Sequence, residues 1–414
     1  MFVSKHDFLQ TFNTSDDPKP YQVKIRNRLV PLTEYATAKQ IQQTDINKLF
    51  QHIETRNDYL TRFYNTSMTP PKDMNIQENP MPETYLNNNA FVKYKNVIRN
   101  MFYKEILQET QSGLANIPSF LVVLIDLYVN RIIDYKILTP SAIHYLNNGR
   151  IGSVFSSFYF RASIMNPYLV FSLNQSVLKG RRIFTPTMGW SSYLYGFLEC
   201  PDVIEYVGTD VIPSVCEKSR LFAKQFYPNK DVTIYESPSE NLLHNAEFIA
   251  KYENHFDTVF FSPPYWQLEM YSSPNQSTTA YPTYEEWLKK YWTATIQLCH
   301  KVMRENGKLC YILSGYNGIN LLEDMNAITA QYFTYSHTQP MHNKNVAATT
   351  HRTTAEQIVV FSSREPTVKP PVGGESGAKL PFPYDPSLSG NQNTKTQYEG
   401  MGSANRRFPE REGS

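Results

Sequence analysis

Residues 259–266 read Val259-Phe260-Phe261-Ser262-Pro263-Pro264-Tyr265-Trp266, an apolar run followed by a serine, two prolines and two aromatic residues. Aromatic and β-branched residues favour a strand, while each proline fixes φ and offers a carbonyl oxygen without an N–H donor. The stretch therefore predicts a buried strand that ends at a rigid loop lined with hydrogen-bond acceptors.

Such a loop suits an exocyclic amine, whose lone pair is delocalised into the ring of a nucleobase. Acceptors that hold both N–H bonds draw this lone pair back onto the nitrogen atom. Ser262 Oγ and the Pro263 carbonyl are placed to accept these bonds, and Tyr265 offers a flat face for a base that has left its stack. A Pro-Pro turn that merely ends a strand is the simpler interpretation of the same residues.

The four residues Ser262, Pro263, Pro264 and Tyr265 resemble the catalytic motif of amino-methyltransferases, which methylate adenine N6 or cytosine N4 in DNA. The continuation Glu269-Met270-Tyr271, with Gln276-Ser277 and residues 284–288, is similar to the phage and viral branch of these enzymes. The resemblance implies an enzyme that uses S-adenosylmethionine as methyl donor and DNA as partner. Glu269 and Tyr271 are then expected to shape the pocket for the base.

Strands alternate with helices from about residue 163 onward. We expect strands at 182–185, 204–210, 232–235, 256–261, 308–313 and 357–361, and helices at 191–198, 213–227 and 284–304. This alternation predicts an α/β fold with a doubly wound sheet. The resemblance specifies it further as a Rossmann-like sheet of the class I methyltransferase type.

The loop after the first expected strand holds the first group of cofactor candidates, because ligands bind beyond the carboxyl ends of parallel strands. Thr185, Pro186, Thr187 and Gly189 resemble the phage-type S-adenosylmethionine loop, and a glycine allows close backbone approach. Two features depart from that pattern. Thr185 stands where an acid is usual, and Ser191-Ser192 replace two glycines.

Further cofactor candidates follow from position. Asp210 ends the second expected strand, where an acid can accept hydrogen bonds from ribose hydroxyls. Glu240, or else Glu236, could accept from the adenine amino group, and we prefer Glu240; a solvated loop carboxylate is the alternative. Asn166-Pro167 resemble the remaining cofactor motif, which precedes the first strand.

Residues 1–160 read as a mainly helical region that could recognise nucleic acid. A helix begins near residue 91 and carries Lys93, Lys95, Arg99 and Lys104 around much of its surface. A solvated basic face is the usual interpretation of such charge, and contact with DNA phosphates is the alternative that the downstream motif favours.

The composition bounds the remaining possibilities. The 414 residues carry a formal net charge of only +2 and four widely spaced cysteines. We therefore expect neither a metal site nor a disulfide framework, and an intracellular, cytoplasmic location, which is the host cytoplasm if the protein is viral. The longest aliphatic run is too short to span a membrane. Residues 161–363 are predicted to form the methyltransferase domain and 364–414 a disordered tail.

Three functions stay open at this point. Methyl transfer to DNA is the first, and the same chemistry on RNA or on a protein glutamine is the second. The third is a degenerate methyltransferase fold that serves as a nucleic-acid-binding or structural subunit, because the cofactor loop departs from the family pattern. The sequence does not specify an oligomeric state.

Overall fold

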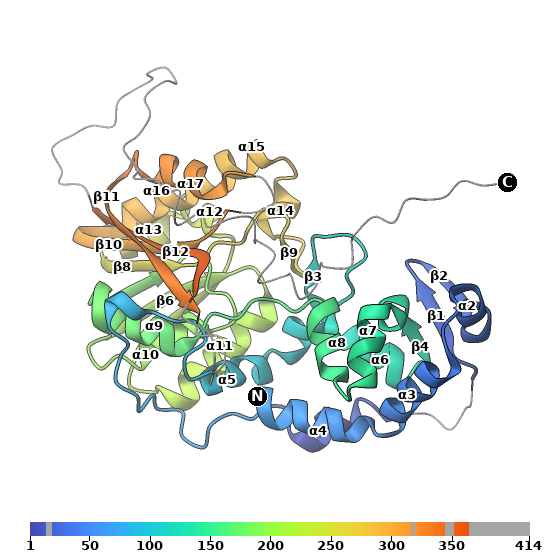
Figure 1. Cartoon of the computed structure of the whole chain (residues 1–414). Helices are drawn as coiled ribbons and strands as arrows, with labels where there is room; N and C mark the ends of the chain where they lie inside the picture. The colour runs from blue at the N-terminus through green and yellow to red at the C-terminus, as the bar shows by residue number, and fades with distance from the viewer. Residues whose placement is uncertain (14–18, 316–318, 344–351, 364–414) are drawn as a thin grey trace. The chain divides into compact units, whose positions relative to one another are not determined.

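The computed structural model describes residues 1–13, 19–315, 319–343 and 352–363, and the predicted tail 364–414 lies outside them. The chain forms two compact units (Figure 1). Unit 2 contains Phe2–Met68 and Tyr103–Ala162, and unit 1 contains Thr69–Phe102 together with the described residues from 163 on. The boundary predicted near residue 160 thus coincides with a unit boundary, whereas Thr69–Phe102 belongs to the unit that holds the large sheet and not to the N-terminal region.

Unit 2 is mainly helical, as expected, but it also contains a small sheet that the sequence did not suggest. Its elements are α1 (Lys5–Gln10), β1 (Gln22–Ile25), β2 (Arg28–Pro31), α2 (Leu32–Lys39), α3 (Gln43–Glu54), α4 (Arg56–Ser67), the π-helix η2 (Glu105–Glu109), β3 (Gln111–Ser112), α6 (Phe120–Tyr128), β4 (Ile132–Asp134), the 3-10 helix η3 (Tyr135–Leu138), α7 (Pro140–Asn147) and α8 (Ile151–Phe158). The small sheet has the order β2-β1-β4. Aromatic rings such as Phe63, Phe120 and Phe155 fill the core of this unit.

Unit 1 is built on a seven-stranded sheet with the order β11-β12-β10-β8-β5-β6-β7. The strands are β5 (Arg182–Thr185), β6 (Glu205–Asp210), β7 (Asp231–Glu236), β8 (Phe256–Phe261), β10 (Met303–Leu313), β11 (Phe333–Asn343) and β12 (Arg352–Ser363). Neighbouring strands pair in parallel along β7, β6, β5, β8 and β10. β12 pairs antiparallel with both β10 and β11. The predicted Rossmann-like sheet of the class I methyltransferase type is confirmed.

Helices cover both faces of this sheet (Figure 1). One face carries α5 (Lys93–Met101), α9 (Pro167–Leu173), α10 (Ser192–Leu198) and α11 (Pro213–Phe226), and the other carries α12 (Ser239–Leu242), α13 (Ala246–Tyr252), α16 (Thr293–Val302) and α17 (Leu321–Thr329). The rings alternate accordingly: Phe260 packs against Tyr193 of α10, whereas Phe261 packs against Trp292 on the opposite face. The close approach of α9 and α10 needs Gly196, since a Cβ there would lie 2.5 Å from the Pro167 carbonyl oxygen.

The remaining elements of unit 1 are short. They are η1 (Glu83–Tyr85), the π-helix η4 (Asn174–Leu178), β9 (Glu269–Met270), α14 (Ser277–Ala280), α15 (Tyr284–Glu286) and the π-helix η5 (Trp287–Trp292). The single long helix predicted over 284–304 is therefore three consecutive segments, α15, η5 and α16, and it ends at Val302.

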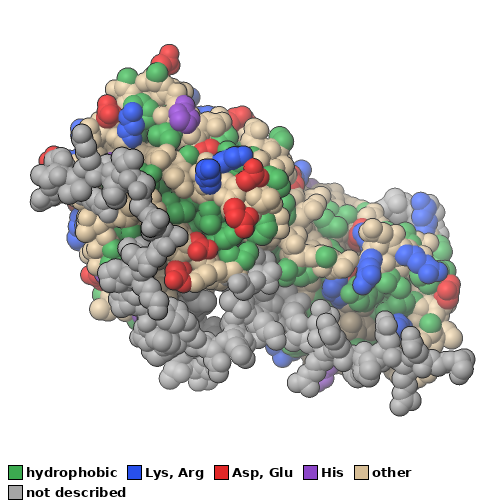
Figure 2. Space-filling model, turned by 90° about the horizontal axis from the view of Figure 1, so that it is seen from above, with side chains coloured by type: hydrophobic (Ala, Val, Ile, Leu, Met, Phe, Trp, Pro, Cys, Tyr) green, Lys and Arg blue, Asp and Glu red, His purple; other side chains and the backbone are tan. Residues whose placement is uncertain are grey.

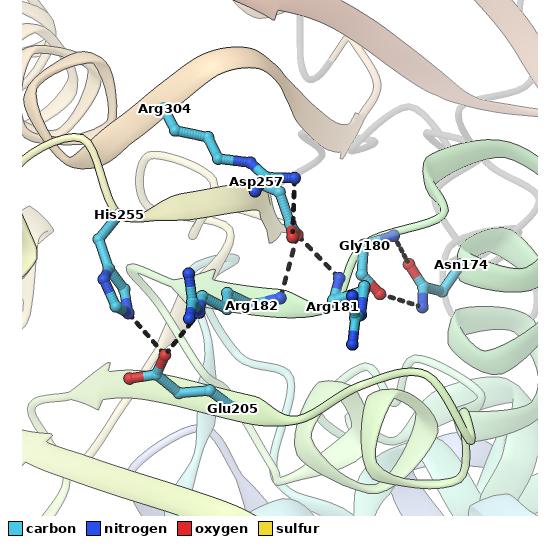
Figure 3. Close-up of polar contacts among 8 residues, drawn as sticks. All are labelled: Asn174, Gly180, Arg181, Arg182, Glu205, His255, Asp257 and Arg304. Atoms are coloured by element: carbon cyan, nitrogen blue, oxygen red, sulfur yellow. Dashed lines mark hydrogen bonds and ion pairs between the residues drawn. The ribbon is translucent and has the colours of Figure 1, made fainter.

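A polar network closes the amino end of the sheet (Figure 3). Asp257 Oδ1 accepts the backbone N–H groups of Arg181 and Arg182, at 2.8 and 3.0 Å, and its other oxygen lies 3.4 Å from Arg304. Glu205 lies 2.6 Å from His255 Nε2. These contacts join the first residues of β5, β6, β8 and β10, at the edge opposite to the one where Ser262–Tyr265 lie.

Candidate functional site

Two loops leave the same edge of the sheet, one after β5 and one after β8. These strands are parallel neighbours, with Phe184 paired to Val259, although their order in the sequence places β6 and β7 between them. β6 lies on one side of β5 and β8 on the other, so this is the point at which the strand order reverses. Ligands of doubly wound sheets bind in the crevice outside such a point.

The Ser-Pro-Pro-Tyr loop is fixed to the end of β10. Ser262 Oγ donates a hydrogen bond to the Ile312 carbonyl oxygen at 3.0 Å, and Ser262 is only half-buried. Because this bond uses the hydroxyl proton, the lone pairs of Oγ stay available to accept an amine N–H. Tyr265 OH accepts the backbone N–H of Ser314 at 2.9 Å, and it lies 3.2 Å from Ser314 Oγ. Pro263 is buried and Pro264 half-buried beside them.

Tyr193 connects this loop to the cofactor loop. The backbone N–H of Ser262 donates to Tyr193 OH at 3.2 Å. The same ring lies below Gly189, where a Cβ built on the glycine would be 3.8 Å from it. Burial raises the pKa of the Tyr193 hydroxyl, which therefore stays protonated near neutral pH. The Tyr193 side chain thus hydrogen-bonds to one loop and lies near the other.

Gly189 and Asp210, two of the predicted cofactor residues, contact each other. Gly189 has a φ of 62°, which favours glycine, and its N–H donates to Asp210 Oδ2 at 2.9 Å. The N–H of Ile212 donates to the other carboxylate oxygen at 3.1 Å. Burial raises the Asp210 pKa to about 6, against the opposing effect of these backbone hydrogen bonds. Thr187 Oγ1 is buried here without a hydrogen-bond partner.

Thr185 and Ser191, which depart from the family pattern, each lie within hydrogen-bond distance of another side chain. Thr185 is buried at the end of β5, and its hydroxyl lies 2.6 Å from Tyr206 OH. Ser191 has a φ of 62° and its Oγ lies 2.5 Å from Ser219 Oγ. Ser191 therefore occupies a backbone conformation in which glycine is usual, and Pro186 is buried between these positions. Thr185 and Ser191 are thus explained by packing within the sheet and α11.

Glu240 and Asn166 lie on the first turns of two helices. Glu240 is buried at 7% exposure, and burial raises its pKa while Tyr281 and Ser239 hydrogen-bond to it. Asn166 caps α9, accepting the Tyr168 N–H at 3.1 Å, and its amide donates to the carbonyl oxygens of residues 88 and 90. Pro167 is buried at the first position of the same helix. Their contact with a cofactor stays a prediction.

Glu269 and Tyr271 meet after the motif. Tyr271 OH donates to Glu269 Oε2 at 2.8 Å, and the backbone N–H of Ser163 donates to Oε1 at 2.9 Å. Burial raises the Glu269 pKa. The Tyr271 ring packs edge-on against Trp190 at 5.8 Å, so the segment after the motif also contacts the cofactor loop.

The four basic residues predicted around one helix belong to different elements. The helix α5 ends at Met101, and Lys104 lies beyond it in unit 2. Lys93 is exposed and pairs with Glu78 at 2.6 Å. Lys95 and Arg99 are half-buried, and Lys95 Nζ donates to Asn89 Oδ1 at 3.4 Å. The sequence predicted one helix that continued past Met101. The apolar spacing continues there because a separate π-helix, η2, follows α5.

Two kinds of site are absent from the described part of the chain. Its residues contain no group of three or more His, Cys, Asp or Glu side chains placed to hold a metal ion. None of its helices is long and apolar enough to cross a membrane.

Sequence reasoning missed Tyr193 and Ser314. Ser314 directly follows β10 and could have been found by the rule that selected Asp210, because both residues stand at the carboxyl end of a parallel strand. Tyr193 carries no comparable signal, since it is one of several aromatic residues on a buried helix.

No protein-family model and no curated protein matches this chain. Among solved structures, TrmN from Thermus thermophilus is similar over 49% of this chain and 50% of its own, with a TM-score of 0.33 and 12% identity. The chain thus spans half the length of TrmN. The N-methyltransferase NodS from Bradyrhizobium japonicum, in complex with S-adenosyl-l-homocysteine, matches over 48% of this chain and 84% of its own (TM-score 0.30, 11% identity).

A predicted O-methyltransferase from Agrobacterium tumefaciens matches over 57% of this chain and 97% of its own, with a TM-score of 0.33 and 14% identity. At such values the similarity carries no information on substrate. The fold assignment rests on the strand order of the sheet itself.

Proposed function

We propose that this protein transfers a methyl group from S-adenosylmethionine to the exocyclic amino group of adenine (N6) or cytosine (N4) in DNA. The observation that carries the proposal is the link from Gly189 through Tyr193 to Ser262. The loop after β5 and the Ser262–Tyr265 loop lie at one edge of the sheet, on either side of the strand-order reversal, which supports a cofactor and an amine meeting there.

The residues present fit the proposed cofactor. Asp210 is the acceptor for the ribose hydroxyls, because the two backbone bonds leave each carboxylate oxygen a further lone pair. Thr187 Oγ1, buried and unpartnered, offers a further polar contact. S-adenosylmethionine would supply an electrophilic methyl group. Thr185 cannot replace the charge of the usual acid, so we expect the amino group of the cofactor to be held less tightly.

The contribution of the protein to the reaction is orientation and hydrogen bonding. Ser262 Oγ and the Pro263 carbonyl oxygen accept the two N–H bonds of the amine, which returns its lone pair to nitrogen for attack. Their hydrogen bonds strengthen as the nitrogen becomes cationic, so they stabilise the transition state more than the bound substrate. Tyr265, held by Ser314, stacks on the base.

The charge distribution gives limited support for DNA as the partner. On the face shown in Figure 2, Lys and Arg side chains are interspersed with Asp and Glu, and the described residues there form no continuous basic surface. With a net charge of +2, we expect moderate affinity for DNA, with selectivity provided by the pocket. All four cysteines are buried with free thiols, which fits our proposal of a cytoplasmic location.

The test is transfer of a labelled methyl group from S-adenosylmethionine by the purified chain, with DNA, RNA and a glutamine-containing peptide as competing acceptors. Loss of a hydrogen bond to a developing charge costs about 1.5–3 kcal/mol. We therefore expect Ser262→Ala to lower kcat by about 10- to 150-fold. Ser336→Ala, an exposed serine of β11, is the matched control.

Each outcome has a distinct meaning. Transfer to DNA that Ser262→Ala impairs supports the proposal, whereas preferential transfer to RNA or peptide changes the substrate and keeps the chemistry. Absence of both transfer and cofactor binding by calorimetry would indicate a non-enzymatic subunit. Transfer that is insensitive to Ser262→Ala would remove the motif from the reaction.

A further inference from the structure

An acidic side chain stands beside the catalytic motif on a strand far along the chain. β12 runs antiparallel to β10, and their last ladder pair at this edge is Gln357 with Leu313. One step further, the ladder places Glu356 across from Ser314, the residue that binds Tyr265 OH. Glu356 is half-buried there. It therefore lies at the carboxyl edge of the sheet and not within the core.

A basic side chain from α5 approaches the same place. Lys95 and Glu356 interact electrostatically, and Lys95 also donates to Asn89 Oδ1 at 3.4 Å. The other charged and titratable groups that act on this pair are Arg99 of α5 and Glu269 of β9. Glu356 in turn raises the pKa of both Tyr265 and Tyr193, although burial is the larger cause for each. Charged groups from α5, β9 and β12 thus act electrostatically on one another or on the tyrosines of the motif.

Burial brings the pKa values of Glu356 and Lys95 closer together. It raises the pKa of Glu356 and lowers the pKa of Lys95, while their mutual attraction opposes both shifts. A carboxyl group and an amine that titrate close to neutral pH exchange protons readily. Such pairs are costly for stability alone and are concentrated at functional sites.

We propose that Glu356, with Lys95 beside it, accepts the proton that the target amine loses on methylation. This inference rests on the function proposed above. In the balanced step, the amine lone pair forms the N–C bond to the methyl group while the C–S bond breaks and its electron pair stays on sulfur. As the N–C bond forms and the nitrogen becomes cationic, one of its two N–H bonds breaks, and its proton leaves the oxygen that held it and moves to a Glu356 carboxylate oxygen. Lys95 holds that carboxylate in its charged form before the transfer.

The assignment also changes the interpretation of Lys95. As part of the amine pocket it would not contact DNA phosphates, so its removal should leave the salt dependence of DNA binding unchanged. Loss of a phosphate contact would instead reduce the log–log salt slope by about 0.9.

The experiment measures single-turnover methyl transfer to DNA between pH 6 and 9 at saturating S-adenosylmethionine, so that titration of Asp210 does not contribute. The parent rate should fall as the pH drops below about 7, since Glu356 becomes protonated there. Glu356→Gln should lower the plateau rate by about 10²-fold, the lower range for a positioned proton acceptor, and should remove this pH limb. Glu356→Asp, which keeps a carboxylate, should restore part of the plateau rate and part of the fall in rate at low pH.

A second variant distinguishes loss of the proton acceptor from loss of the fold. Glu356→Gln alone leaves the Lys95 charge without its carboxylate, which can destabilise the fold. The double variant Lys95→Met, Glu356→Gln removes both charges, and we expect it to melt and to bind S-adenosylmethionine like the parent. Glu247→Gln, an exposed residue of α13, is the control substitution.

The results separate the two proposals. A double variant that transfers methyl groups at the parent rate, or that keeps the pH limb, overturns the role of Glu356 and leaves the methyltransferase proposal intact. Complete absence of transfer by the parent chain overturns both.

Discussion

Asp210 combines two backbone hydrogen bonds with a raised pKa, and the combination has a consequence for the cofactor. The Gly189 and Ile212 N–H groups favour the charged carboxylate, yet burial outweighs them and moves the pKa to about 6. The side chain is therefore a charged acceptor at pH 8 and is largely neutral at pH 5. A ribose held by this carboxylate should respond to pH in the same range.

We predict that affinity for S-adenosylmethionine falls as the pH drops through about 6, by about tenfold for each unit below it. Asp210→Asn should weaken binding by about 1.5–3 kcal/mol at pH 8 and remove this pH dependence. Titration calorimetry from pH 5 to 8 measures both effects, with the exposed Asp202→Asn as control. A parent affinity that is constant over this range would exclude Asp210 from the cofactor site.

Protonation of Asp210 does not itself destabilise the fold. The folded-state pKa of Asp210 is raised above its ordinary value of 3.8, so the folded chain binds this proton more readily than the unfolded chain. The cost of burying the charged form is present above the folded pKa and disappears as the pH falls below it. Through this group, acid reduces binding without reducing stability.

At the scale of the element, β8 has different tasks at its two ends. Its carboxyl end carries Ser262 and the loop to Tyr265, whereas Asp257 near its amino end binds the start of β5 and Arg304 of β10 (Figure 3). The strand itself is buried. Stability and chemistry are thus separated along one short strand.

We expect Asp257→Ala to lower the free energy of unfolding by about 1.5–3 kcal/mol, because two backbone donors lose a charged acceptor. The ion pair with Arg304 adds little, since Arg304 is half exposed. Urea unfolding measures the loss, and Asp202→Ala provides the control. Affinity for S-adenosylmethionine in the folded variant should equal that of the parent; a weaker affinity would show that the two ends of β8 are coupled.

Elements with strong local signals could be predicted from the sequence. Residues 182–185 and 256–261 are strands with the predicted bounds, because apolar and aromatic residues run without interruption between turn signals. β11 was missed, since Pro340 and many polar residues obscure this edge strand, which pairs with β12 within the sheet. The π-helix η5 was also missed, because its 287–292 segment has ordinary helical periodicity.

At the scale of the whole molecule, the site depends on contacts that no local pattern contains. Asp210 and Ser262 could be placed because they stand at the carboxyl ends of predicted strands. Glu356 could not, because only the pairing of β12 with β10 brings it to Ser314. Lys95 was assigned to a basic surface because the sequence gives no sign that Thr69–Phe102 packs in the unit of the sheet.

A fragment of residues 163–363 should therefore fail to fold as a stable unit, although it contains every strand of the large sheet. Without Thr69–Phe102 it loses the packing of Tyr94 against Tyr168 and Tyr195, and of Phe102 against Trp190. We expect a broad thermal transition by circular dichroism and binding of a hydrophobic dye, compared with a cooperative transition for the full chain. Fusing residues 69–102 to the fragment through a flexible linker should restore cooperativity; a fragment that melts cooperatively alone would contradict this account.

The interrupted unit also constrains how this protein can recombine with others. Between residues 2 and 363, its backbone passes between the two units at three junctions, 68/69, 102/103 and 162/163. A crossover at any single junction would separate α5 from the sheet or divide unit 2 into halves from different parents. A recombinant that keeps both units intact must therefore take Phe2–Met68 and Tyr103–Ala162 from the same parent. Unit 2 cannot be exchanged as one continuous N-terminal segment.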